Sequence, residues 1–161
     1  MWRSYFGERC RIYGVDIEKA CKAYKNDFTT VFIGDQEDVN FWRTTKEALP
    51  PIDILIDDGG HTPGQQRVTL EGMLPSLSPG GVYICEDIHR KNNDFSAYAT
   101  SLVDQLNDMG DLNSFQKSIN SIHFYPYCMV IEKNEVIREK LFAPKQGTEW
   151  QPFFDQGDSG T

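Results

Sequence analysis

The sequence predicts a three-layer, doubly wound α/β fold with a mostly parallel sheet and a C-terminal antiparallel hairpin. Three observations support this fold class. Strand-like segments alternate with helix-like segments, two of the strands are apolar on both faces, and 161 residues suit one domain. Such alternation favours parallel strands joined by right-handed crossovers. We expect the domain to occupy residues 1–141 and a loosely ordered, polar tail to follow at 142–161.

The predicted elements follow one another in a regular order. A short helix at Trp2–Glu8, which ends at Gly7, comes first. After it, β-branched and aromatic segments predict strands, and segments with apolar residues at helical spacing predict helices. The predicted strands are Arg11–Ile17, Thr29–Gly34, Ile52–Ile56 and Val82–Cys85, and the helices that follow them are Glu18–Lys25, Asp38–Leu49, Pro63–Leu77 and Asp94–Met109.

The last two predicted strands form a hairpin. Ser121–Phe124 and Cys128–Glu132 have strand-like composition, and Tyr125-Pro126-Tyr127 separates them. Proline cannot donate a backbone hydrogen bond to a neighbouring strand, so we place it at the turn between them.

Composition excludes several classes of function. The net charge of -8 argues against a surface that binds nucleic acid, and it favours a small-molecule ligand. No apolar run reaches the roughly 18 residues that span a bilayer, so we expect no membrane association. The four cysteines include no pair at the two-residue spacing of a zinc or redox motif. We therefore expect reduced thiols and a cytoplasmic protein.

Each of the first four predicted strands is followed by acidic residues. Ligands of open parallel sheets bind beyond the carboxyl ends of the strands, so these acids lie where a ligand is expected. Asp16 after the first strand could accept hydrogen bonds from ribose hydroxyls, and Asp35 and Gln36 after the second could face an adenine. The alternative for Asp16 and Asp35 is that each caps the next helix.

Four carboxylates follow the third and fourth strands. These residues are Asp57, Asp58, Glu86 and Asp87, and the two strand ends should be neighbours in the sheet. Without a cation the carboxylates would repel one another. An oxygen-rich set of two or three carboxylates suits Mg²⁺, which keeps part of its water shell. The alternative is a set of separate helix caps and solvated loop residues.

Two histidines lie close to these acids in the sequence. His61 follows Gly59-Gly60, which can bring the ring over the strand end, and histidine can accept a proton near neutral pH. This makes His61 a candidate general base, although a turn histidine without a catalytic role remains an alternative. A second reading combines His61, His89 and one acid as a non-haem iron site of an oxygenase.

Several segments together resemble the class I S-adenosylmethionine-dependent methyltransferases of the macrocin O-methyltransferase type, a group that includes cephalosporin hydroxylase-like proteins. The matching segments are RIYGVDIE (11–18), VFIGDQED (31–38), IDILIDDGGH (52–61), LSPGGVYICED (77–87) and the hairpin SIHFYPYCMVIEK (121–133). The resemblance implies a Rossmann-like fold, S-adenosylmethionine and Mg²⁺. It implies the following roles: metal ligands Asp58, Glu86 and Asp87, catalytic base His61, ribose ligand Asp16, adenine ligand Asp35 or Gln36, and Asp57 near the methionine portion.

The expected function is Mg²⁺-dependent O-methyl transfer to a hydroxyl of a sugar or polyketide-like small molecule. One feature departs from the family, because no G-x-G occurs before Asp16. The resemblance therefore implies an N-terminally truncated domain without the central strand and its Gly-rich loop. Loss of that strand would expose one edge of each of the strands that end at Asp16 and Asp57. Either these two edges pair with each other, or a second copy of the chain or an N-terminal segment completes the sheet. The alternative is a methyltransferase remnant that acts as a binding or assembly module.

Overall fold

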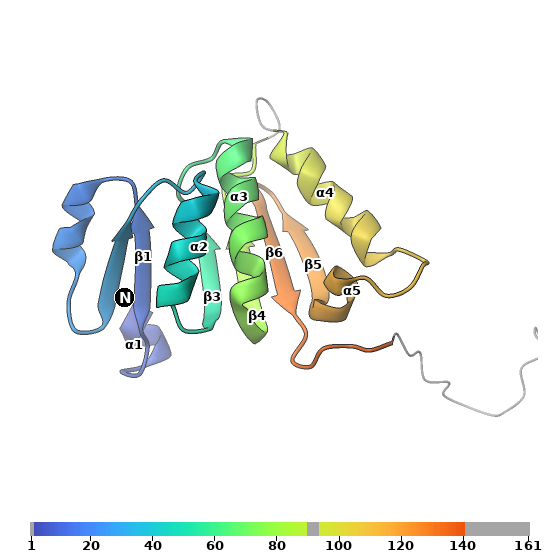
Figure 1. The fold of residues 1–161 in the computed structure, drawn as a ribbon, viewed down its shortest axis with the longest axis horizontal. Coiled ribbons are helices and arrows are strands. Elements are labelled where there is room, and N and C mark those ends of the chain that lie inside the picture. Colours follow the sequence, from blue (N-terminus) through green and yellow to red (C-terminus); the bar gives the residue numbers. More distant parts are fainter. Residues whose placement is uncertain (1, 90–93, 141–161) are drawn as a thin grey trace, which may run out of the picture.

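The computed structural model describes residues 2–89 and 94–140, and most of the expected strands and helices occur there (Figure 1). The strand expected at Val82–Cys85 is longer than predicted, since it begins at Leu77. The predicted tail at 142–161 lies outside the described residues. The elements are α1 (Trp2–Phe6), β1 (Ile12–Asp16), η1 (Lys19–Tyr24), β2 (Thr29–Ile33), α2 (Val39–Ala48), β3 (Ile52–Asp57), α3 (Pro63–Met73), η2 (Leu74–Ser76), β4 (Leu77–Cys85), α4 (Phe95–Leu106), α5 (Ser114–Ser118), β5 (Ile119–Tyr125) and β6 (Cys128–Lys133).

Three helical elements differ from the sequence-based prediction. The segment predicted as a helix at Glu18–Lys25 is a 3₁₀ helix, η1. The helix predicted to reach Leu77 ends at Met73, and a 3₁₀ turn that contains Pro75 follows it. The sequence analysis missed the five-residue helix α5. A capping box between Asn113 and Gln116 begins α5, and this N-x-x-Q pattern is readable in the sequence.

The strands form two sheets, with a break where the resemblance implies that the central strand is missing. Strands β1 and β2 make a parallel pair, and the second sheet has the order β3-β4-β6-β5. Within it, β3 and β4 are parallel, whereas β6 runs antiparallel to β4 and β5, which confirms the C-terminal hairpin. In the described part of the chain, β1 and β3 do not pair with each other. Each of them therefore leaves one edge of its backbone unpaired.

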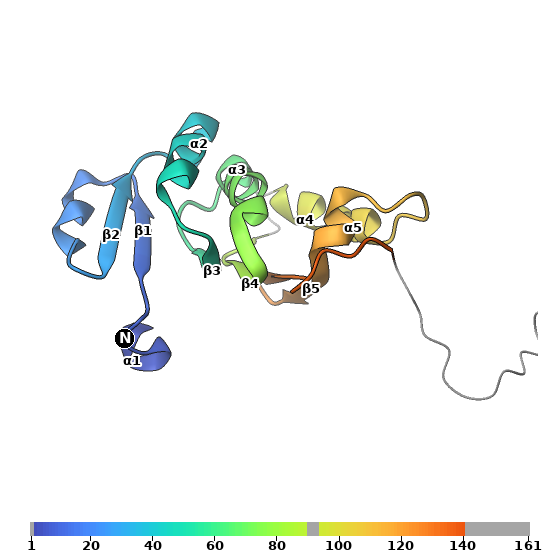
Figure 2. The ribbon, with the colours of Figure 1, turned by 60° about the horizontal axis from the view of Figure 1, so that its bottom comes forward.

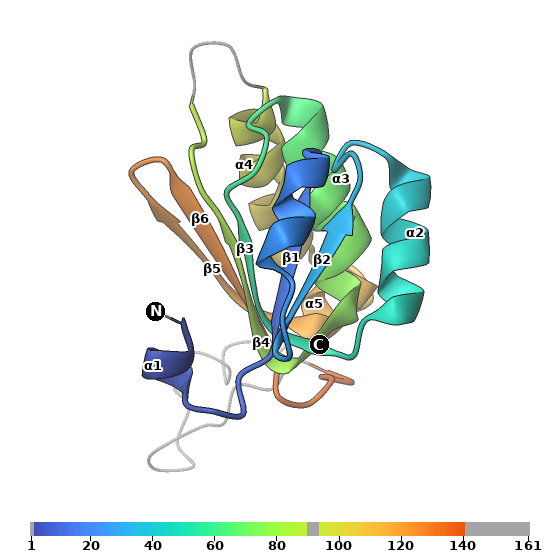
Figure 3. The ribbon, with the colours of Figure 1, turned by 90° about the vertical axis from the view of Figure 1, so that its left-hand side faces the viewer.

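The helices α2, α3 and α4 lie along one side of the strands, and α1 lies on the other side (Figures 2 and 3). Tyr83, Met129 and Ile131 point from the four-stranded sheet into a core that α3 and α4 complete with Leu70 and Phe95. The opposite face of this sheet is only partly covered, since Ile54 and Ile56 of β3 are 42% and 40% exposed. A three-layer fold predicts helices on both sides of this sheet. Among the described residues, helices cover only one side of it.

The register of β3 and β4 determines where their carboxyl ends lie. Asp57, the last residue of β3, is opposite Cys85, the last residue of β4. The loops that follow these parallel strands therefore begin next to each other, at the same edge of the sheet. No helix among the described residues is long and apolar enough to cross a membrane.

Candidate metal centre

Asp57 ends β3 as a buried carboxylate with its own hydrogen-bond donors. Only 5% of the residue is exposed, and its Oδ2 accepts a 3.0 Å hydrogen bond from the Tyr83 hydroxyl. Gln36 Nε2 donates to Asp57 Oδ1, also at 3.0 Å. Burial raises the pKa of Asp57, while the hydrogen bonds from Tyr83 and Gln36 act in the opposite direction. Asp57 therefore fixes the end of β3 from inside the protein, and its expected place near a methionine portion remains a prediction.

The loop after Asp57 needs both of its glycines. A methyl group at Gly59 would collide with Gln36 Oε1, and a methyl group at Gly60 would collide with the Gln65 side chain. The Gly60 N–H donates a 2.6 Å hydrogen bond to Gln36 Oε1. Two residues later, Thr62 caps α3 through a capping box with Gln65. The loop that carries Asp58 and His61 is thus held at Gly60 and at the start of α3.

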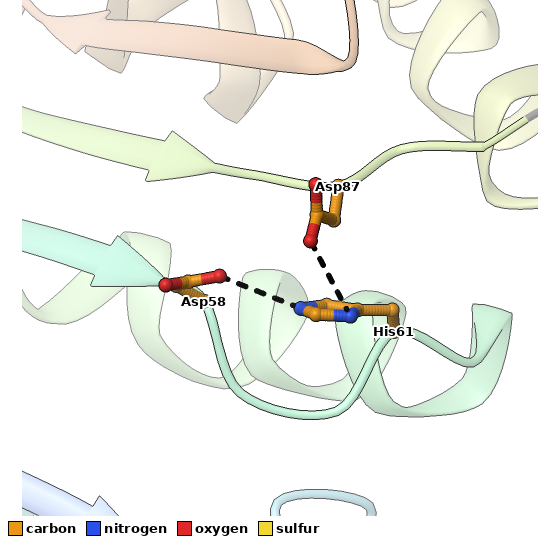
Figure 4. A group of neighbouring side chains, drawn as sticks. All are labelled: Asp58, His61 and Asp87. Carbon is orange, nitrogen blue, oxygen red and sulfur yellow. Dashed lines mark ion pairs between the residues drawn. The ribbon is translucent and has the colours of Figure 1, made fainter.

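Asp58, His61 and Asp87 form a compact group at the ends of β3 and β4 (Figure 4). One ligand atom from each residue lies within 4.8 Å of the other two. The imidazole lies between the acids, with Nε2 at 3.5 Å from Asp58 Oδ1 and Nδ1 at 3.8 Å from Asp87 Oδ2. The structure therefore brings together two of the three expected metal ligands and the expected base.

Asp87 reaches this group because the chain leaves strand geometry after Cys85. Asp87 has a φ of 53°, and the next residue, Ile88, donates a 3.0 Å backbone hydrogen bond to Tyr127 at the hairpin turn. Glu86 does not belong to the group. Burial, together with the charge of Glu86, raises the pKa of Cys128 on β6. The expected role of Glu86 as a metal ligand remains a prediction.

The donor atoms of the group fit a divalent cation. Two carboxylates and one imidazole offer two or three ligand atoms, and the side chains of Asp58, His61 and Asp87 are 58%, 33% and 49% exposed. Water can therefore fill further positions around an ion, as Mg²⁺ requires. Carboxylate oxygens are typical ligands of Mg²⁺ and Mn²⁺, and an imidazole also suits transition metals.

Within residues 2–89 and 94–140, no group that could hold a metal ion contains two histidines. His89 Nε2 is 3.9 Å from Asp87 Oδ1, whereas His61 approaches the other carboxylate oxygen of Asp87, Oδ2. The His89 ring lies against Tyr127, with 5.3 Å between the ring centroids. Among the described residues, the metal-competent group contains one histidine, His61. This geometry gives no support to the iron oxygenase reading.

The residues expected to bind a nucleoside lie at the ends of β1 and β2. Asp16 accepts hydrogen bonds from the Glu18 N–H at 2.8 Å and from the Cys21 thiol at 3.1 Å, and these bonds lower its pKa. Asp35 accepts a 2.8 Å hydrogen bond from the Glu37 N–H. Both acids thus stabilise the turns that follow their strands. Neither caps the next helix, because the N-cap residues of η1 and α2 are Glu18 and Asp38. The roles of Asp16 and Asp35 with ribose and adenine remain predictions.

Sequence analysis missed the buried residues that form hydrogen bonds with Asp57 and Gln36. Tyr83 and Thr69 are 0% and 2% exposed, and they contact Asp57 and Gln36 respectively. Trp42 Nε1 donates a 2.8 Å hydrogen bond to the Gln36 carbonyl. The prediction of a buried strand at Val82–Cys85 did not identify Tyr83 as a partner of Asp57. No pattern in the sequence paired Gln36 with the loop after β3.

The chain is similar to sugar O-methyltransferases of antibiotic pathways. It is 29% identical to 8-demethyl-8-alpha-L-rhamnosyl tetracenomycin-C 2'-O-methyltransferase of Streptomyces olivaceus, over 83% of this chain and 40% of that protein. It is 39% identical to demethylmacrocin O-methyltransferase of Streptomyces fradiae, over 55% of this chain and 22% of that protein. The chain thus spans well under half the length of these curated relatives. No protein-family model matches it.

A solved structure matches the fold described above. MycE methyltransferase, in complex with Mg, SAH and mycinamycin VI, superposes with a TM-score of 0.72 and 25% sequence identity. The match covers 83% of this chain and 38% of MycE. A second crystal form of MycE, with Mg and SAH, gives a TM-score of 0.75 over 99% of this chain. In sequence and fold, the chain is thus similar to S-adenosylmethionine-dependent methyltransferases of the macrocin O-methyltransferase type.

Proposed function

We propose that this chain belongs to an enzyme that transfers a methyl group from S-adenosylmethionine to a sugar hydroxyl of a glycosylated polyketide, with the help of Mg²⁺. The observation that carries the proposal is the group of Asp58, His61 and Asp87 at the ends of two parallel strands. Its chemistry agrees with MycE, whose solved complexes contain Mg and SAH. The names of the relatives supply the acceptor class, since they act on rhamnosyl, mycinamicin and olivosyl compounds.

Each residue of the group has a distinct role in this proposal. Asp58 and Asp87 hold the cation, and Glu86 becomes a third ligand if its side chain turns toward them. A bound divalent cation lowers the pKa of a hydroxyl that it contacts. His61, between the two acids, accepts the proton of the acceptor hydroxyl as general base. The acids also keep the ring in place and favour its charged form after proton transfer.

The proposed cofactor side of the site uses the ends of β1, β2 and β3. Asp16 would bind the ribose, Asp35 or Gln36 would lie near the adenine, and Asp57 would lie near the methionine portion. These strand ends lie where parallel sheets bind ligands. The proposed location is the cytoplasm, because the four cysteines are expected to be reduced thiols.

The direct test is methyl transfer from S-[methyl-³H]adenosylmethionine to a rhamnosyl tetracenomycin acceptor, with Mg²⁺ or with EDTA. We expect labelled product only with Mg²⁺, and we expect Asp58→Asn to abolish it. Asp53→Asn is the matched control, because Asp53 is an exposed acid on β3, the strand that precedes Asp58, and lies outside the group. Transfer that is equal with Mg²⁺ and EDTA would contradict the metal-dependent mechanism. Calorimetry that detects no binding of S-adenosylmethionine would contradict the proposal for this chain.

One observation supports a second candidate, a binding or assembly module. Strands β1 and β3 each leave an unpaired edge in the described part of the chain, and β3 also exposes Ile54 and Ile56. Unpaired edges readily accept another strand. A segment of a longer protein or a second copy could therefore complete the sheet. Light scattering after size exclusion tests this candidate. A mass that rises with concentration supports association, whereas a constant monomer mass that still binds S-adenosylmethionine contradicts it.

A further inference from the structure

The side chain of Gln36 joins the loop after β2 to the loop after β3. Its Oε1 accepts the 2.6 Å hydrogen bond from the Gly60 N–H. Its Nε2 donates to Asp57 Oδ1 at 3.0 Å and to Thr69 Oγ1 at 3.2 Å. Both N–H bonds of the amide are therefore used inside the protein. This favours a structural task for Gln36 over direct contact with an adenine.

Gln36 is itself held on both sides. The Trp42 indole donates a 2.8 Å hydrogen bond to the Gln36 carbonyl, and Trp42 is only 5% exposed. Thr69, which receives the second N–H bond, is 2% exposed on α3. The amide also packs so closely on Gly59 that a side chain there would collide with Oε1. An amide with these neighbours has little freedom to turn.

Gln36 contacts the residue before Asp58 and the residue before His61. Asp57 precedes Asp58, and Gly60 precedes His61, so one amide fixes the neighbour of each. We propose that Gln36 is a positioning residue that fixes the separation of Asp58 and His61 and thereby raises the affinity of the site for a divalent cation. This inference rests on the proposed function, since it assumes that Asp58 and Asp87 bind the ion. Gln36 itself does not touch the metal.

The test measures Mn²⁺ binding to the chain by electron paramagnetic resonance of the free ion, without any need for turnover. Gln36→Met preserves the length of the side chain and removes all three of its hydrogen bonds. We expect it to weaken Mn²⁺ binding about 10- to 100-fold, the usual effect of losing a partner that orients ligands. Thr69→Val removes one of the three bonds and should weaken binding by a smaller factor.

Gln116→Met is the matched control for a general loss of stability. Gln116 is another buried glutamine, 2% exposed, whose Nε2 donates to the carbonyls of Leu106 and Asp108 at the far end of α4. We expect this variant to unfold at lower urea concentration but to bind Mn²⁺ like the unaltered chain. Binding is measured at a temperature at which circular dichroism shows each variant to be folded. If Gln36→Met does not fold, the Mn²⁺ affinity of Thr69→Val is compared with that of Gln116→Met, and weaker binding by Thr69→Val alone supports the role of Gln36.

The outcomes separate the inference from the function on which it rests. Equal Mn²⁺ affinity of the unaltered chain, Gln36→Met and Thr69→Val would overturn the role of Gln36 and leave the metal site intact. Equal weakening by Gln36→Met and Gln116→Met would also overturn it, because a general loss of rigidity would then be sufficient. Failure of the unaltered chain to bind Mn²⁺ would overturn the metal site and the role of Gln36 with it.

Discussion

Asp58 and Asp87 lie just after the ends of two neighbouring parallel strands, and a carboxylate oxygen of one lies within 4.8 Å of a carboxylate oxygen of the other. Two like charges at this distance destabilise the folded chain unless a cation or a proton compensates them. His61 lies between them and can supply one positive charge. A divalent cation would compensate both carboxylates without a proton on the imidazole, and a general base acts in its unprotonated form.

Replacement of His61 separates its possible roles as base and as ligand. We expect His61→Asn to lower the rate of methyl transfer about 100-fold or more, because the proton of the acceptor hydroxyl loses its acceptor. We expect the affinity for Mn²⁺ to fall by less than about tenfold, since the carboxylates remain. Mn²⁺ titration and the tritium transfer assay measure the two effects. A rate that falls only in proportion to lost metal would show that His61 acts as a ligand.

Glu86 provides a second test of the ligand set. If its carboxylate turns toward Asp58 and Asp87, Glu86→Gln should weaken Mn²⁺ binding about tenfold or more, because one charged ligand is lost. Glu71→Gln is a suitable control, since Glu71 lies on α3 and pairs with Arg67 at 2.8 Å. Mn²⁺ affinity that is unchanged in Glu86→Gln would restrict the protein ligands to the group seen in the structure.

The Tyr83 hydroxyl stabilises the buried end of β3. Tyr83→Phe removes its 3.0 Å hydrogen bond to Asp57 and leaves a buried carboxylate with one donor fewer. We expect the free energy of unfolding to fall by about 1.5–3 kcal/mol, the usual value for a hydrogen bond to a charged group. Urea denaturation at neutral pH measures it.

Tyr98→Phe is the matched control for this variant. The Tyr98 hydroxyl also donates to a carboxylate, that of Glu71 at 3.1 Å, but this bond lies at the surface. Its loss should lower the free energy of unfolding by about 1 kcal/mol or less. Equal losses in the two variants would contradict the account of Asp57 as a buried, donor-dependent carboxylate.

The four cysteines should differ in their reactivity. Cys85 is 0% exposed, and burial raises the pKa of its thiol, so the reactive thiolate is scarce in the folded chain. Cys10 is only partly buried. A short pulse of iodoacetamide, followed by mass spectrometry of peptides, should label Cys85 at least about tenfold more slowly than Cys10. The two rates should converge in urea, and similar rates without urea would contradict the burial of β4.

Local patterns predicted most of the elements of this fold. The apolar strand Ile52–Ile56 and the start of the helix at Pro63 are short-range features, and both occur within one residue of the expected positions. The division into two sheets could not be derived in the same way, because pairing between β1 and β3 depends on residues distant in the chain. The resemblance implied that these two strand edges are exposed by the missing central strand. In the structure they do not pair with each other.

The candidate site was predicted in part. The positions of Asp58, His61 and Asp87 follow from one rule, that the carboxyl ends of parallel strands meet at one edge of the sheet. The side-chain directions did not follow from the sequence. Asp87 adopts a positive φ that composition does not indicate, and Gln36 turns inward to Asp57 and Gly60. These features depend on contacts between separate loops.

The most direct test of the central claim is calorimetric titration of Mg²⁺ into the unaltered chain, Asp58→Asn, Asp87→Asn and Asp53→Asn. We expect one site in the unaltered chain and in Asp53→Asn, because Asp53 lies on β3 outside the group. We expect Asp58→Asn and Asp87→Asn each to weaken the site about tenfold or more, since each removes a charged ligand. Equal affinity in all four chains, or no Mg²⁺ binding to the unaltered chain, would contradict a metal centre at the ends of β3 and β4.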